Sequence, residues 1–122
     1  MLTKLTRLSL TAVFAATVLA AAPALAFDKI KSKSDFMNVV QGKSLTMIGI
    51  SVNVQPDGVI GGKAYGRAVK GEWRWSDGYF CRDLFWGEMD LGPNCQEVRV
   101  QGDTVRFQSD KGTGRYADLR IR

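Results

Sequence analysis

The chain has 122 residues, a formal net charge of +5 and no histidine. Without histidine it lacks the usual general base, the partner of a nucleophilic serine or cysteine, and the commonest metal ligand, so we expect neither a metal site nor a cofactor. The basic residues are scattered along the sequence, which favours solvated strand faces over a nucleic-acid groove and leaves only a weak contact with an anionic envelope surface.

Residues 1–26 have the pattern of a cleavable secretory signal peptide. Lys4 and Arg7 give a basic start, a mostly apolar run follows, and a small-residue A-x-A site ends at Ala26. The run is short for a membrane-spanning helix, although a retained anchor is the alternative. Cleavage after Ala26 reduces the 17 basic residues to 15 against 12 acidic ones, a net charge of +3, and leaves one domain at residues 27–122. We therefore predict a periplasmic or secreted protein.

The exported part begins with one short predicted helix. Ser34 is a candidate N-cap, and Gly42 is a candidate stop. Phe36, Val39 and Val40 are spaced i, i+3 and i+4, so they form one apolar stripe that can close an end of a sheet.

From residue 45 onward, apolar and polar residues alternate in short runs bounded by turn signals, which is typical of half-buried strands. A phase change near Met47 predicts a β-bulge, and Gly61, Gly62 and Gly66 predict bends or close backbone approaches. We predict seven strands, over residues 45–54, 59–70, 71–75, 79–86, 95–100, 104–109 and 115–122, with residues 87–94 as the one long connection.

This pattern predicts an all-β fold, an antiparallel meander with one short N-terminal helix. Because an open sheet must protect its edges, we expect the meander to close into a small barrel. A short open sandwich is the alternative.

The two cysteines predict a disulfide. Cys81 lies on the second arm of a hairpin whose turn is at residues 76–78, and 13 residues separate it from Cys95. An exported chain meets an oxidising compartment, and closing a loop of this length contributes on the order of 3 kcal/mol. A reactive free thiol is the alternative, but the sequence offers no nearby base to activate it.

Six aromatic residues fall within the 14 residues from Trp73 to Trp86. At an open barrel mouth they could stack on a flat or apolar ligand while an arginine holds its anionic end. The candidate ligand-binding residues are Trp73, Trp75, Tyr79, Arg82 and Trp86. The alternative, that the rings fill the core, is favoured for Trp73 and Trp75 and stays open for Trp86.

Three carboxylates, Asp83, Glu88 and Asp90, lie close together in the sequence. A hydrolase with two catalytic carboxylates needs them to face one cleft. Together with Asn94, two of them could also ligate calcium, although no DxDxDG pattern is present. Ordinary surface charge is the favoured interpretation, so we predict no catalytic residue.

Several segments resemble a group of short exported bacterial proteins that often carry the name dihydrodipicolinate reductase. They are GEWRWSDGYFCR (71–82), WG (86–87), DLG (90–92), NCQ (94–96) and RFQSDKGTG (106–114). The name implies a cytoplasmic NAD(P)H enzyme with a Rossmann domain and a catalytic histidine. This chain has no histidine and no G-x-G-x-x-G in a βαβ setting, so we interpret the name as inherited rather than functional. The arrangement is also similar in architecture to lipocalin-like and small protease-inhibitor barrels, without the lipocalin G-x-W near Gly42.

We therefore predict an exported, non-catalytic, monomeric barrel. It would bind a small apolar or anionic ligand at the aromatic mouth, or a protein partner through residues 87–94. The alternative is an enzyme, either the reductase of the family name or a carboxylate-dependent hydrolase.

Overall fold

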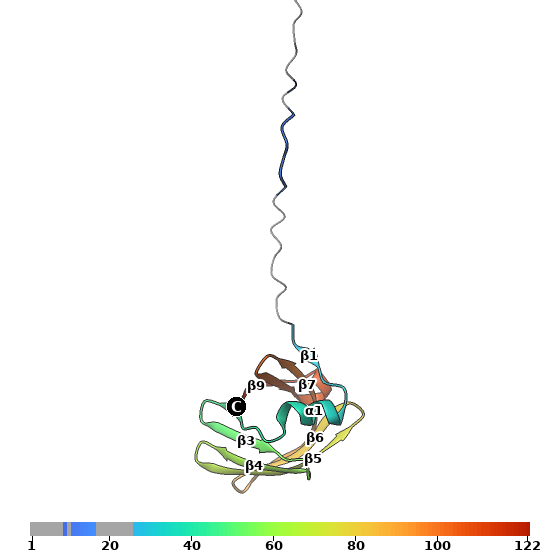
Figure 1. Cartoon of the computed structure of the whole chain (residues 1–122). Coiled ribbons are helices and arrows are strands. Elements are labelled where there is room, and N and C mark those ends of the chain that lie inside the picture. Colours follow the sequence, from blue (N-terminus) through green and yellow to red (C-terminus); the bar gives the residue numbers. More distant parts are fainter. Residues whose placement is uncertain (1–8, 10, 17–25) are drawn as a thin grey trace, which may run out of the picture.

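A computed structural model describes residues 9, 11–16 and 26–122. The predicted signal peptide, residues 1–26, lies largely outside these described residues. Within them, no helix is long and apolar enough to cross a membrane. Residues 27–122 fold as a closed antiparallel β-barrel of eight strands with one extra strand and two short helices (Figure 1).

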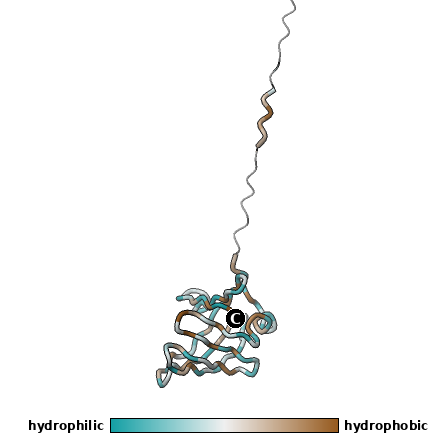
Figure 2. Tube along the Cα trace, turned by 60° about the vertical axis from the view of Figure 1, so that its left-hand side comes forward, coloured by the Kyte–Doolittle hydropathy of each residue, from teal (hydrophilic) through white to brown (hydrophobic). Residues whose placement is uncertain are grey.

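The elements follow in the order β1 (Asp28–Lys29), α1 (Lys33–Val40), β2 (Leu45–Met47), β3 (Ile50–Val54), β4 (Val59–Ala64), β5 (Arg67–Ser76), β6 (Tyr79–Trp86), β7 (Met89–Gln101), β8 (Thr104–Gln108), α2 (Ser109–Gly112) and β9 (Tyr116–Ile121). Strands β2 to β9 pair in chain order, and β9 pairs back with β2, which closes the ring. β1 pairs with the end of β7, where Asp28 lies opposite Val100. This part of β7 follows residues 89–96, which pair with β6. Apolar and polar residues alternate along the barrel strands (Figure 2). The predicted all-β barrel is thus confirmed.

The predicted number of seven strands was wrong because residues 45–54 and residues 59–70 each contain a hairpin turn, and because residues 67–70 and the predicted strand 71–75 form the single strand β5. The phase change near Met47 is not the predicted β-bulge but a turn at Ile48 and Gly49. Met47, just before this turn, pairs with Ile50, just after it. A turn at Tyr65 and Gly66 divides residues 59–70 in the same way. In both turns the glycine has positive φ, the left-handed conformation that lets two residues reverse a strand.

The predicted long connection at residues 87–94 was also wrong. A turn at Gly87 and Glu88 leads directly into β7, which continues the sheet. Pairing shifts register between Asp83 and Phe85, so β7 carries an extra residue there. Gly92, with φ +74°, makes this bulge possible.

α1 closes one end of the barrel and lies between its β7–β9 side and its β3–β5 side (Figure 1). Its N-cap is Ser32, not the predicted Ser34, because the Ser32 hydroxyl accepts a hydrogen bond from the Asp35 amide at 3.2 Å. α2, which was not predicted, is a single turn with two left-handed residues. Phe36 and Val40 of α1 are fully buried, so the helix acts as a plug.

The predicted disulfide joins Cys81 and Cys95, which lie directly opposite each other on β6 and β7. Alternation places both sulfurs on the outer face of the barrel, since Phe80 and Gln96, their neighbours, face inward. Disulfides persist in oxidising, non-cytoplasmic compartments, which agrees with export.

Gly62 permits a close approach between β3 and β4. Its φ is +135°, and a Cβ there would meet the Ser51 carbonyl oxygen and lie 2.7 Å from the Val52 Cα. We expect Gly62→Ala to lower the free energy of unfolding by at least about 2 kcal/mol in urea titrations. Gly61→Ala is the matched control, because a Cβ at Gly61 meets only the Asn53 side chain at 3.4 Å. Equal stability of the two variants would contradict the close approach.

Candidate functional site

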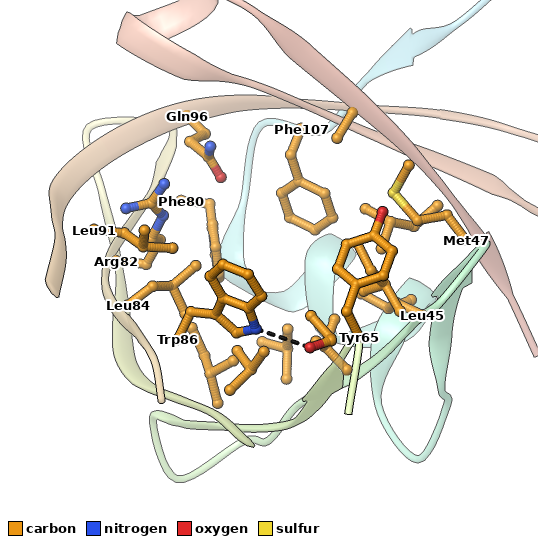
Figure 3. A pocket seen from close by; sticks show the side chains of 18 residues that line it. Leu45, Met47, Tyr65, Phe80, Arg82, Leu84, Trp86, Leu91, Gln96 and Phe107 are labelled. Atoms are coloured by element: carbon orange, nitrogen blue, oxygen red, sulfur yellow. Dashed lines mark hydrogen bonds between the residues drawn. The ribbon is translucent and has the colours of Figure 1, made fainter. Parts of the chain in front are cut away.

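The barrel is filled at the α1 end and hollow at the other. The hollow part is a cavity of about 330 Å³ (Figure 3), which corresponds to the liquid volume of about eleven water molecules. The open end, here called the mouth, is bordered by the β2–β3, β4–β5 and β6–β7 turns. Met47, Tyr65 and Leu91 line the cavity and are also exposed, so the cavity opens to solvent at the mouth.

Alternation along each strand supplies the lining. On β6, every second residue from Phe80 to Trp86 faces the cavity, whereas Cys81 and Asp83 face outward. Strands β2, β3 and β4 contribute only apolar side chains, among them Leu45, Val52 and Ile60. The wall formed by these three strands is here called the apolar wall.

Arg82 is the one charged residue among the described residues that line the cavity. Its Nη1 donates a hydrogen bond to the Gly92 carbonyl at 2.7 Å, whereas its Nε is buried and has no partner in the described part of the chain. Desolvation by burial lowers the pKa of Arg82, and the nearby charge of Asp83 partly opposes that shift. The guanidinium stays protonated all the same, because its ordinary pKa is far above neutral.

Gln96 of β7 is the second polar group on this side. Its side chain is 9% exposed, and its Nε2 donates a hydrogen bond to the Ser109 hydroxyl at 3.1 Å. In Figure 3, Gln96 and Arg82 lie on one side of the cavity, and Leu45 and Met47 lie on the other. The side of the cavity formed by β6 and β7 therefore carries two polar side chains, Arg82 and Gln96, among apolar ones. This side is here called the polar wall, and it faces the apolar wall.

Two aromatic rings stand at the mouth. The Trp86 Nε1 donates a hydrogen bond to the Ala64 carbonyl at 2.8 Å, and the Trp86 and Tyr65 rings make an edge contact with centroids 6.4 Å apart. The Tyr65 ring is packed so closely on Gly49 that any side chain at position 49 would collide with it. Tyr65 is nonetheless 67% exposed, so it can take part in contacts with a ligand that enters the mouth.

The structure separates the five predicted ligand-binding residues. Arg82 and Trp86 line the cavity. Trp73 and Trp75 instead pack against Phe36 at the closed end, with ring centroids 5.4 and 5.3 Å from it. Tyr79 is not part of the lining, and its ring lies beneath the ammonium groups of Lys29 and Lys111, 5.7 and 5.5 Å away.

Sequence reasoning missed Tyr65 and Gln96. Tyr65 was placed inside a long strand, although the Tyr-Gly pair is a hairpin turn. Gln96 could have been found from its position next to Cys95, because a disulfide on the outer face turns the following side chain inward.

The three candidate carboxylates do not line the cavity. Asp83, Glu88 and Asp90 are all exposed, and Asp90 accepts a hydrogen bond from the Gly92 amide at 2.8 Å. Asn94 is engaged with Asp110 through two hydrogen bonds of 2.8 and 2.9 Å. Within the described residues, no three side chains of His, Cys, Asp or Glu are grouped to hold a metal ion.

Comparison with protein-family models, with curated proteins and with solved structures finds no significant match. The class of protein therefore follows from the geometry alone, which is that of a small disulfide-linked β-barrel with an apolar cavity. The likeness to the exported bacterial group and to lipocalin-like barrels stays a prediction.

Proposed function

We propose that this exported protein, periplasmic or secreted, acts by binding and not by catalysis, and that it holds a small apolar or anionic ligand in the barrel cavity. The observation that supports this most is the hollow itself. Its space of about 330 Å³ is lined almost entirely by apolar side chains and opens to solvent at the mouth. Water in this space finds few hydrogen-bond partners, so an apolar ligand of matching size is favoured in its place.

The chemistry of the lining also favours binding. Among the described side chains that line the cavity there is no histidine and no carboxylate, the usual general bases, and the guanidinium of Arg82 stays protonated near neutral pH. A nicotinamide dinucleotide, the cofactor that the family name implies, is much larger than the cavity.

A protein partner at residues 87–94 was the other expectation. That expectation depended on a long loop, and the segment is instead a tight turn and a bulged strand with Asp90 and Arg82 both bonded to Gly92. The proposal therefore rests on the small ligand.

The test is a titration of the purified, oxidised, exported protein, in which fluorescence of Trp86 reports on the cavity. Medium-chain carboxylates, aromatic acids and envelope lipids are the ligands, and NADPH at millimolar concentration tests the reductase alternative. We expect saturable binding of at least one apolar ligand and none of NADPH. Absence of a response to every apolar ligand would refute the proposal.

A variant that fills the cavity gives a sharper result. Ala117 lines the cavity on β9, so Ala117→Phe should occupy the space and weaken ligand binding by about tenfold or more. Its melting temperature should stay equal or rise, because a void is filled. Ala68→Phe is the control, since Ala68 is exposed on β5 and does not line the cavity. Unchanged binding by a folded Ala117→Phe protein would place the ligand elsewhere.

A further inference from the structure

The two sides of the cavity differ in charge, and this difference determines which kind of ligand the cavity accepts. Its polar wall carries a single positive charge, that of Arg82, and the opposite apolar wall carries none. Because an apolar surface and a fixed cation face each other across one small space, a ligand that satisfies both must itself have an apolar side and a polar end.

Arg82 forms no ion pair in the described part of the chain, although the charge of its neighbour Asp83 acts on it. Within the described residues the ion pairs involve Arg99, Arg106 and Arg120, and none involves Arg82. Its neighbour Asp83 is exposed on the outer face of β6, and Arg82 donates its hydrogen bond to a neutral carbonyl, that of Gly92. Half-buried charges in folded proteins are usually paired, so a half-buried Arg82 without an ion pair at the cavity favours an anionic group on the ligand.

The guanidinium is also held in place. The bond from its Nη1 to Gly92 joins β6 to the bulge of β7 and uses only one of its five N–H donors. Gln96, on the same wall, adds an adaptable amide. Donors that are already oriented suit a planar carboxylate, which guanidinium groups bind with one or two parallel hydrogen bonds.

We infer that the ligand is an apolar monocarboxylate whose carboxylate binds Arg82 and whose apolar body lies against the wall of β2, β3 and β4. If each non-hydrogen atom of a ligand takes up the liquid volume of one water molecule, the cavity holds a ligand of about eleven non-hydrogen atoms. Octanoate and decanoate are molecules of this size. Trp86 and Tyr65 border the mouth through which it enters (Figure 3). This inference rests on the proposed function and specifies its ligand.

The experiment compares the affinities of three ligands that have the same chain length but different head groups: decanoate, decanol and decylamine. Wild-type protein should bind decanoate about tenfold or more tighter than decanol, and decylamine most weakly. 2-Naphthoate tests whether an aromatic body is accepted in place of a chain. The preference for decanoate over decanol should disappear at a pH low enough to protonate the carboxylate, a result that needs no variant.

Arg82→Gln should abolish the preference, because it removes the one positive charge among the described residues that line the cavity. Arg82→Lys, which keeps the charge, should retain part of the preference. Arg74→Gln is the matched control, since it removes one positive charge from an exposed residue of β5 that does not line the cavity, and it should behave as wild type.

The outcomes separate the two claims. Equal affinity of wild-type protein for decanoate, decanol and decylamine would overturn the carboxylate inference and leave the apolar binding function standing. A preference that survives in folded Arg82→Gln would overturn it as well. Failure of all three ligands and of 2-naphthoate to bind would overturn the proposed function itself.

Discussion

Phe36→Ala is expected to lower the free energy of unfolding by about 3–5 kcal/mol, the range for removing a fully buried aromatic ring. The Phe36 side chain is 0% exposed. Its ring contacts four others, those of Trp73, Trp75, Phe80 and Phe107, at centroid distances of 5.4, 5.3, 5.2 and 6.2 Å. An eight-residue helix is not stable in isolation, so α1 depends on this contact to stay on the barrel.

Urea denaturation of wild type and variant measures this loss. Phe85→Ala is the control, because Phe85 is 43% exposed on the outer face of β6, and its removal should cost less than about 1 kcal/mol. If the two variants were equally stable, the plug would not be the centre of the core. Because total stability is roughly 5–15 kcal/mol for a domain of this kind, the loss in the Phe36 variant removes a large share of it.

The barrel could be predicted from the sequence because alternation of apolar and polar residues is a property of each strand by itself. The hairpin that carries Trp73 and Cys81 was found for this reason, with its turn at Asp77 and Gly78. The shorter hairpins were missed because a two-residue turn shifts the alternation by one residue, which a β-bulge does as well. Ile48 is apolar and Tyr65 aromatic, so neither looks like a turn residue, and only the positive φ of the following glycines shows where the chain reverses.

The candidate site was predicted only in part because alternation gives the face of a residue but not its depth in the barrel. Trp73, Trp75 and Arg82 all face inward. The position of Phe36 along the barrel decides that the two tryptophans belong to the filled end and that Arg82 belongs to the cavity. That position depends on how α1 packs, which local sequence patterns do not record.

Loss of the Cys81–Cys95 disulfide is expected to lower the free energy of unfolding by about 3 kcal/mol, from the entropy of closing a loop with a sequence separation of 14. β6 and β7 pair on both sides of the bond, so the folded barrel keeps its hydrogen bonds without it and the effect comes mainly from the unfolded chain. For a domain of this size the melting temperature should fall by roughly 12–24 °C.

Thermal melting with and without reductant measures this effect, and the double variant Cys81→Ser with Cys95→Ser should melt like the reduced protein and ignore reductant. A melting curve that does not change in reductant would show that the bond adds no stability. The size of the loss also bears on the compartment. For a domain with a total stability of roughly 5–15 kcal/mol, about 3 kcal/mol from a disulfide is a large share. A compartment that keeps cysteines reduced would therefore hold a much less stable barrel, which is a physical reason to expect the protein in an oxidising one.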